Sequence, residues 1–252
     1  DNEADSARII RGLVSIYGNL TNYKLLLLAS GGNKKRTSTI YDYFTKLYDV
    51  STSNFDAVQT NEAAQPFLKR KFVGTEKQSL RNTQLNQRSL AHANVTFTTT
   101  QAWTVSIVLN WQGSNNAISL IAGNTSARGI MNRNGSLNKF RYLSASADAT
   151  IPSDSSDTIG KTVLLTVKHT GTELSFFVDG VLVYAPLAYD SAQVFGALLG
   201  FYAGREFFGN IYAYSIQNVA VSDANIKSES ILYKNIYKDF ETVTIGSHQY
   251  VN

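Results

Sequence analysis

The chain has 252 residues, of which 43% are hydrophobic and 12% aromatic, a composition that folds into a globular structure with a sizeable core. Charged residues make up only 17%, and the net charge of +4 is scattered, so we expect no nucleic-acid partner. The absence of cysteine excludes a disulfide scaffold, a thiolate metal site and a cysteine nucleophile. No segment reaches the about 20 apolar residues that a spanning helix requires, and we expect no membrane insertion.

The first 90 residues mix helical and strand signals. Apolar residues from Ala7 to Tyr17 recur at helical spacing, with a weak interruption at Gly12, and predict a short N-terminal helix. The apolar run Tyr23–Ala29 is typical of a buried strand. Two further short strands are predicted at Thr45–Val50 and Asp56–Thr60. We interpret residues 1–90 as an N-terminal extension that packs on the main domain.

A regular strand pattern fills the second half of the chain. From Trp103 to Trp111 apolar residues alternate with polar ones, with Val108 as the exception, and Trp103 is predicted to lie in the core. Asp179-Gly180 is a strong hairpin signal because both central residues of a type I′ turn need a positive φ. The other predicted strands are Ile118–Ala122, Arg128–Met131, Phe140–Ser144, Thr162–Lys168, Leu174–Val178, Val181–Tyr184, Leu198–Tyr202 and Gly209–Asn218.

These short strands, separated by frequent turns, predict an all-β fold: a two-sheet antiparallel β-sandwich or jelly roll over residues 91–238. Ser222 and Asp223 read as an N-cap and an acidic first turn, and the apolar spacing that follows predicts a C-terminal helix ending near Tyr237. Residues 239–252 are interpreted as an extended C-terminal tail.

One stretch near the N-terminus resembles a known segment. KLYDVSTSNFDAVQT at Lys46–Thr60, followed by Ala64-Gln65-Pro66, is similar to the segment that precedes laminin-G-like domains of the concanavalin A superfamily in phage tail and fibre proteins and in bacterial surface proteins. A related stretch occurs in family-54 arabinofuranosidases. The glycines of the usual turn are replaced here by residues 51–55, so this turn must be built differently.

A second set of segments resembles the closing half of laminin-G-like jelly rolls: LSFFVDGV at Leu174–Val181, FGNIYAYSI at Phe208–Ile216 and VSDANI at Val221–Ile226. The C-terminal FETVTIGSHQY at Phe240–Tyr250 is similar to the opening of a module common in surface and phage proteins. We therefore expect the natural polypeptide to continue past Asn252, with residues 239–252 as the start of a further module.

The resemblance implies a concanavalin A-like or laminin-G-like fold and a non-enzymatic role. The expected function is a structural or binding module of a phage virion, in a fibre or decoration protein, that contacts host-surface glycans or neighbouring virion subunits. The expected partners are other virion or surface-protein subunits. We expect a homo-oligomer, with a trimer favoured, and a location in the virion, outside the cell. The alternatives are a secreted or cell-surface bacterial adhesin or carbohydrate-binding module, and a glycoside hydrolase of the concanavalin A-like or arabinofuranosidase type.

The pattern of acidic residues does not favour an enzyme. Glycosidases need two carboxylates on one face, which residues two apart on a strand supply most simply. Neither Glu173 nor Glu206 has an acidic neighbour two positions away. The histidines match no zinc-ligand spacing and no hydrolase triad, and His169 is expected to be a surface or edge residue.

Sugar binding calls for an exposed aromatic side chain beside planar hydrogen-bonding groups. The candidates for carbohydrate contact are Trp111, Asn115, Arg141, Tyr142, Tyr202 and Arg205. The alternative for each of these aromatic residues is a position in the core or in a subunit interface. The fourteen tyrosines of the chain suit subunit packing as well as they suit glycan contact.

Calcium is the one cofactor that the resemblance suggests, since laminin-G-like domains often bind it at the rim of the sandwich through Asp and Asn side chains. Asp148, Asp154 and Asp157 share one Ser/Asp-rich loop and are the candidate ligands. The alternative for the same loop is an ordinary polar turn.

Overall fold

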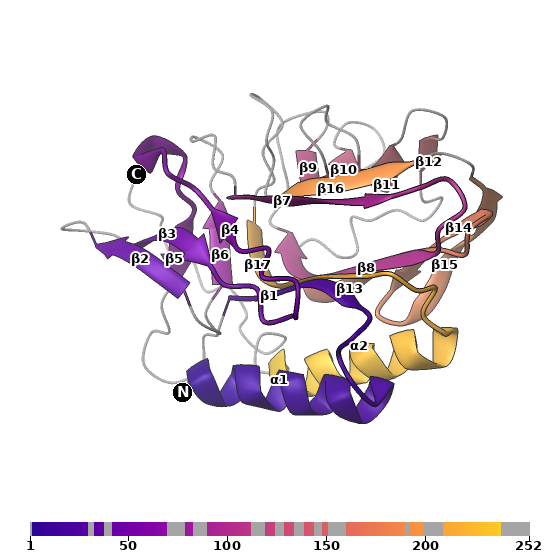
Figure 1. Ribbon diagram of the computed structural model, residues 1–252, viewed down its shortest axis with the longest axis horizontal. Coiled ribbons are helices and arrows are strands. Elements are labelled where there is room, and N and C mark those ends of the chain that lie inside the picture. The colour runs from indigo at the N-terminus through magenta and orange to yellow at the C-terminus, as the bar shows by residue number, and fades with distance from the viewer. Residues whose placement is uncertain are drawn as a thin grey trace.

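The computed structural model describes residues 2–29, 33–37, 42–69, 79–82, 90–111, 119–123, 129–133, 139–143, 148–150, 160–189, 192–198 and 209–237. They form a β-sandwich with a layer of helices against one sheet (Figure 1). The helices are α1 (Asn2–Tyr17) and α2 (Asp223–Tyr237), and a 3-10 turn lies at Glu62–Ala64. Neither α1 nor α2 has the length and apolar character of a membrane span.

The strands are β1 (Tyr23–Leu28), β2 (Asn33–Thr37), β3 (Asp42–Leu47), β4 (Ala57–Val58), β5 (Phe67–Lys69), β6 (Ser79–Asn82), β7 (Leu90–Phe97), β8 (Trp103–Trp111), β9 (Ser119–Gly123), β10 (Gly129–Arg133), β11 (Lys139–Leu143), β12 (Asp148–Thr150), β13 (Thr162–His169), β14 (Glu173–Val178), β15 (Val181–Ala188), β16 (Gln193–Leu198) and β17 (Gly209–Gln217).

The strands pair in two layers. The first, which we call the helix-covered sheet, has the order β15-β14-β13-β8-β17-β1. The second, which we call the open sheet, has the order β4-β7-β16-β9-β10-β11-β12. All of these pairs are antiparallel, and pairings through β6, β5 and β3 join the two layers along one edge. The predicted two-sheet antiparallel β-sandwich is confirmed.

The core between the two sheets is built by alternate residues. On β8 the side chains of Trp103, Val105, Ile107 and Leu109 are all fully buried in this core. Trp103 stacks on Phe97 with the ring centroids 6.1 Å apart. Each fully buried large apolar side chain contributes about 2 kcal/mol to folding, so this row fixes which face of β8 points inward.

A second core lies between the helix-covered sheet and the helices. Val108 of β8, the exception in the sequence alternation, packs here with Leu164, Tyr212, Ile9 and Tyr233. The remaining members of this cluster are Leu13, Tyr23, Leu26, Leu28, Ala213, Ile236 and Tyr237. Val108 is apolar because its face of the sheet meets helices and not water.

Polar residues on the helix side of β8 are buried as well. Thr104, Ser106 and Asn110 are exposed by only 1%, 3% and 6%. Thr104 Oγ1 accepts a hydrogen bond from the Val221 amide at 3.0 Å and donates to the Val219 carbonyl at 2.8 Å. These bonds tie the segment before α2 to the sheet, so the polar half of the β8 alternation is structural.

The turn between β14 and β15 supports α2. Asp179 and Gly180 have φ values of 53° and 77°, which confirms the predicted hairpin turn. Asp179 Oδ1 accepts a hydrogen bond from the Leu164 amide at 2.9 Å, and Asp179 Oδ2 pairs with Lys234 Nζ of α2 at 3.0 Å. A Cβ atom at Gly180 would lie 2.7 Å from the Cα of Lys227. The helix therefore rests directly on the glycine.

The segment that resembles the laminin-G motif is a structural clamp around Asp49. Asp49 Oδ1 accepts hydrogen bonds from the amides of Leu26 and Ser51, both at 2.9 Å. Asp49 Oδ2 accepts from the Ser51 hydroxyl at 2.7 Å and from the Phe55 amide at 2.9 Å. Asn54 supplies the positive φ of the turn, 56°, where the usual motif has glycine. Asp49 thus ties the loop to β1.

Asp56 closes the same loop. Its Oδ1 accepts a hydrogen bond from the Asp49 amide at 2.9 Å, and its Oδ2 pairs with Lys46 Nζ at 2.6 Å. Partial burial acts to raise the pKa of Asp56, but the hydrogen bonds from Lys46 and from the Asp49 amide outweigh it and lower the pKa. The side chain is therefore held as a carboxylate.

Several sequence expectations need correction or fall outside the described residues. The sequence predicts His169 as a surface or edge residue, but it is fully buried at the end of β13, and its ring nitrogens lie 3.0 Å from the Gln101 carbonyl and 3.3 Å from the Tyr189 carbonyl. Of the strand predicted at Leu198–Tyr202, only Leu198 is described, and it is the last residue of β16. Two strands of the first 90 residues belong to the sandwich, since β1 pairs with β17 and β4 pairs with β7. The boundary at residue 90 between the N-terminal extension and the sandwich stays a prediction. Residues 239–252 are not described.

The close contact of Gly180 with α2 can be tested separately from the positive φ of this residue. Gly160 has nearly the same φ, 76°, but no atom lies within 4 Å of the position that a Cβ would take there. Gly160→Ala should cost only the strain of a left-handed alanine, about 1 kcal/mol. Gly180→Ala should cost about 1–3 kcal/mol more because its methyl group collides with α2. Urea unfolding of the two variants measures the difference, and equal losses would contradict the close packing of α2 on the turn.

Removal of the Asp49 carboxylate should destabilise the fold strongly. Asp49→Ala leaves the amides of Leu26, Ser51 and Phe55 without an acceptor, with an expected loss of at least about 3 kcal/mol in unfolding free energy. Asp223→Ala is the control, since its carboxylate is 63% exposed and its ion pair among the described residues is with Lys168. The control should lose no more than about 1 kcal/mol. Similar losses for both variants would show that the clamp is not structural.

Candidate functional site

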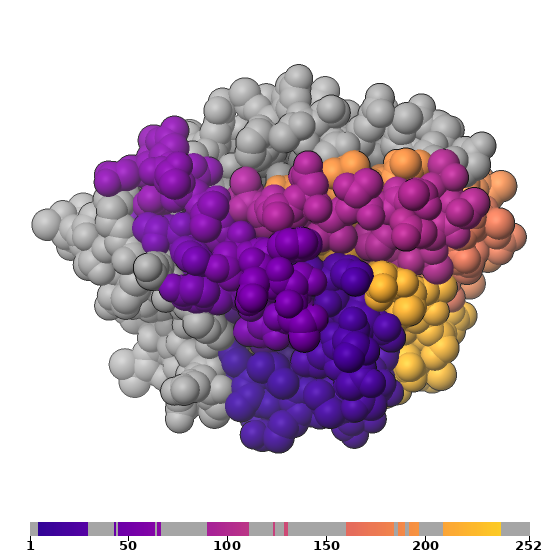
Figure 2. All heavy atoms as spheres, viewed as in Figure 1, coloured from indigo at the N-terminus to yellow at the C-terminus, as the bar shows by residue number. Residues whose placement is uncertain are grey.

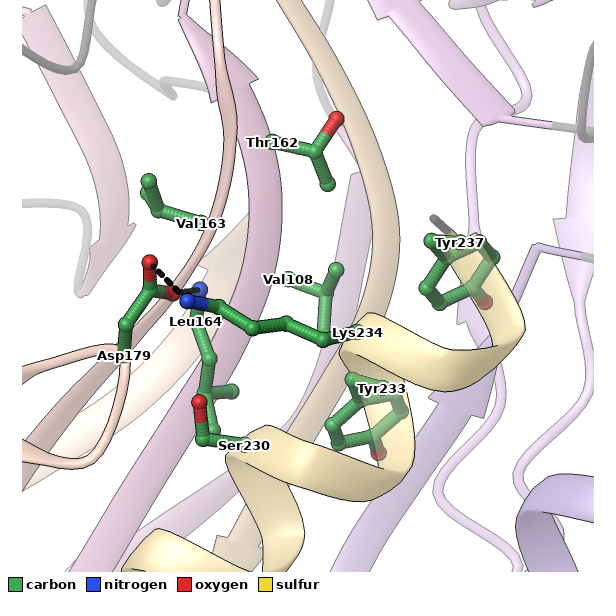
Figure 3. A pocket seen from close by; sticks show the side chains of 9 residues that line it. All are labelled: Val108, Thr162, Val163, Leu164, Asp179, Ser230, Tyr233, Lys234 and Tyr237. Carbon is green, nitrogen blue, oxygen red and sulfur yellow. Dashed lines mark hydrogen bonds and ion pairs between the residues drawn. The ribbon is translucent and has the colours of Figure 1, made fainter. Parts of the chain in front are cut away.

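The helix side of the molecule offers no room for a ligand among the described residues. In the space-filling view α1 and α2 lie side by side over this face (Figure 2). A hollow between α2 and the sheet has a free volume of about 10 Å³, enough for about one water molecule. Figure 3 shows its lining residues, which are Val108, Thr162, Val163, Leu164, Asp179, Ser230, Tyr233, Lys234 and Tyr237. The Asp179–Lys234 ion pair fills its polar side.

The predicted carbohydrate-contact residues are divided between the two sheets or lie outside the described part. Trp111 ends β8 in the helix-covered sheet, opposite Gly209. Arg141 and Tyr142 belong to β11 in the open sheet. The side chains of these residues are not described, and neither are Asn115, Tyr202 and Arg205. All of these assignments stay predictions.

The register of β11 distinguishes its two candidate positions. Position 142 is opposite Ile130, whose side chain is fully buried in the core between the sheets. Position 141 is opposite Met131.

The calcium prediction is not resolved by the structure. Asp148 opens β12 opposite Leu143, its side chain is not described, and Asp154 and Asp157 lie outside the described residues. Within the described part of the chain, no group of three or more acidic or histidine side chains could hold a metal ion. The proposed ligands stay a prediction.

The outward face of the open sheet is accessible at its β4–β7–β16 side. Along β7 the side chains of Leu90, Val95 and Phe97 are buried between the sheets, while Ala93, Asn94 and Thr96 are exposed. Two consecutive exposed residues break the alternation, and β7 has extra residues here because Phe195 pairs with Val95 and Ala197 pairs with Ala91. Such bulges reorient side chains on the surface of a sheet.

The bulge places Asn94 over Gly196 of β16. A Cβ atom at Gly196 would lie 2.1 Å from Asn94 Oδ1, so a side chain at position 196 would displace the amide from its present position. Thr96 is opposite Val194, and Val58 of β4, 40% exposed, is opposite Ala91. We call the outward positions of these strands, Val58, Ala91, Ala93, Asn94, Thr96, Val194 and Gly196, the β7 face.

The β7 face is neutral. None of its residues carries a charge, and it combines an amide, a hydroxyl, small side chains and one apolar edge residue. The buried His92 on the opposite side of β7 does not change this, because burial lowers its pKa and favours the neutral ring. A neutral surface with planar hydrogen-bonding groups can contact an uncharged polar ligand.

Sequence reasoning missed the β7 face. The alternation of Val95 and Phe97 with Thr96 is a strand signal, but it covers only a few residues and the bulge at Ala93 and Asn94 interrupts it. No sequence pattern indicates that Gly196 on a distant strand lies under Asn94.

No model of a known protein family matches the sequence, and no curated protein is similar to it in sequence. Solved structures are similar in fold. The chain matches the binding domain of Paraclostridial Mosquitocidal Protein 1 with a TM-score of 0.56 and 12% identity, over 85% of this chain and 53% of that one. It matches Trypanosoma rangeli sialidase with a TM-score of 0.55 and 11% identity, over 90% of this chain and 38% of that one.

A third match is domain 4 of an extracellular arabinanase from Geobacillus stearothermophilus, solved in complex with arabinotriose. It has a TM-score of 0.52 and 14% identity, over 73% of this chain and 92% of that one. The chain thus spans about half the length of the mosquitocidal binding domain and less of the sialidase. At these identities the matches show the β-sandwich fold alone.

Proposed function

We propose that this protein is a non-catalytic carbohydrate-binding module that contacts its glycan through the β7 face. The observation that carries the proposal is the unequal covering of the two sheets. Helices cover the outer side of the helix-covered sheet over β1, β17, β8 and β13, where the described hollow holds about one water molecule, while Asn94 and Thr96 of the open sheet are exposed. A bound chain of sugars would lie on the open sheet.

The residue types of the β7 face suit an uncharged sugar. The Asn94 amide supplies both a donor and an acceptor, and the Thr96 hydroxyl supplies one of each. Gly196 and the alanines leave the sheet surface low, so a flat ring can approach it.

Structures similar in fold support the ligand class. One is a domain whose structure was solved with arabinotriose, one is a sialidase, and one is a binding domain. The proposal extends to this chain only the ligand class that the arabinotriose complex and the sialidase indicate, a carbohydrate, and leaves its sugar composition open.

The biological setting that we propose is a phage virion. The likeness of Lys46–Thr60 to segments in phage tail and fibre proteins supports it, as does the low content of charged residues. In this setting the module belongs to a fibre or decoration protein, forms a homotrimer and faces host-surface glycans or neighbouring subunits outside the cell. The alternative setting is a secreted or surface-bound bacterial adhesin or carbohydrate-binding module.

A glycoside hydrolase is the second candidate, favoured by the sialidase and by an arabinofuranosidase among the similar structures. The acidic pair that the described residues bring together, Asp49 and Asp56, argues against it. Each Asp49 oxygen accepts two hydrogen bonds, from the loop and from the Leu26 amide of β1, and Asp56 is paired with Lys46. Asp239 and Glu241 are two positions apart in the sequence and lie outside the described residues. We therefore propose that the protein binds glycans without cleaving them.

The glycan proposal can be tested by binding to an array of oligosaccharides, followed by calorimetry with the best ligand. Asn94→Ala combined with Thr96→Ala should weaken that binding at least about tenfold, because both side chains lose hydrogen bonds to the sugar. Gly196→Ala should weaken it as well, since its methyl group displaces the Asn94 amide.

Ser228→Ala is the matched control, because Ser228 is an exposed residue on α2 whose hydroxyl donates to the Ala224 carbonyl of its own helix. It should bind the glycan like the wild type. Absence of binding to any oligosaccharide refutes the proposed function, whereas binding that survives the Asn94 and Thr96 changes refutes only the β7 face. Release of reducing sugar from the bound ligand would establish the hydrolase instead.

A further inference from the structure

A buried carboxyl group joins the two helices to the helix-covered sheet. Glu229 of α2 is 0% exposed, and its Oε2 accepts a hydrogen bond from the Tyr17 hydroxyl of α1 at 2.7 Å. Tyr17 in turn packs edge-on against Tyr23 of β1, with ring centroids 5.9 Å apart. The carboxyl therefore lies where α1, α2 and β1 meet.

The carboxyl of Glu229 is incompletely bonded. Within the described residues its Oε1 is buried without a hydrogen-bond partner, while the Tyr23 hydroxyl and the Gln217 amide lie close to the Tyr17 hydroxyl that bonds Oε2. Buried polar atoms are rarely left without a partner, and such an atom marks a functional constraint or internal solvent. The glycan proposal makes no use of this carboxyl.

No cation among the described residues compensates Glu229. The titratable groups that face it are Tyr17 from α1, Tyr23 from β1 and Tyr233 from its own helix, and β17 contributes the neutral Gln217. Two lysines near α2 are engaged elsewhere: Lys168 pairs with Asp223, and Lys234 pairs with Asp179. A negative charge on Glu229 would thus stand unpaired in the second core.

We propose that Glu229 is a proton-controlled latch: the protonated carboxyl holds α1 and α2 on the sheet, and its ionisation loosens this helix layer. The neutral acid can stay among Tyr17, Tyr23 and Gln217, whereas the carboxylate is stabilised only by the Tyr17 hydroxyl unless the helices separate and admit water. The latch is independent of the β7 face and of any ligand.

The direction of the pH effect follows from the burial. Burial raises the pKa of Glu229 from 4.5 to about 7, and the hydrogen bond from Tyr17 only partly opposes the rise. A carboxyl whose pKa is higher in the closed state favours that state at low pH and loses this contribution as the pH rises from about 4.5 to about 7. The helix layer should therefore open more readily above neutral pH.

Amide hydrogen exchange of the intact protein tests the latch. After correction for the intrinsic exchange rate, the opening equilibrium of α1 and α2 should increase roughly twentyfold between pH 5.5 and pH 8. Glu229→Gln should remove this increase, because an amide does not titrate. Glu173→Gln, a change at an exposed carboxyl, should keep it.

Tyr17→Phe supplies a second readout if Glu229→Gln does not fold. Loss of the Tyr17 hydroxyl removes the one bond that favours the carboxylate, so the midpoint of the pH dependence should move to higher pH. A wild-type helix layer that opens equally at both pH values overturns the latch. So does pH dependence that persists in Glu229→Gln, or a midpoint that Tyr17→Phe leaves in place.

Discussion

Burial of both faces of the helix-covered sheet is the constraint on which the rest of the structure depends. Trp103, Ile107 and Leu109 of β8 face the open sheet, while Val108 and the polar residues between them face the helices. Two contacts hold the helices against the outer face of this sheet. Thr104 bonds the Val221 amide in the segment before α2, and Gly180 in the β14–β15 turn leaves space for Lys227 of α2. The helices thus complete the fold and are not an addition to it.

This covering separates structure from recognition. The helix layer removes one outer surface of the sandwich, and the outward row of β7 and β16 remains accessible beside small residues. The helix layer also buries a carboxyl group, that of Glu229. We therefore assign ligand contact to the open sheet and a response to pH to the helix layer, two roles that rest on different residues and can be tested separately.

The sequence was sufficient for the architecture and insufficient for the site. The alternation from Trp103 to Trp111, with Val108 as its exception, located β8, and the turn chemistry of Asp179-Gly180 located the β14–β15 hairpin, because both signals are local. The alternation alone does not reveal that the polar row of β8 is buried, since the helices that cover it are distant in sequence. The contact of Asn94 with Gly196 depends on a bulge and a long-range pairing, which no local pattern encodes.

Residue-resolved amide exchange of the free protein at low pH tests the central claim most directly. If both faces of the helix-covered sheet are sealed, the amides of β8 and β17 should exchange most slowly of all, and those of α1 and α2 should be protected well above the exposed strand β4. Exchange of β17 as fast as that of β4, with the helices unprotected, would contradict a sheet buried on both sides.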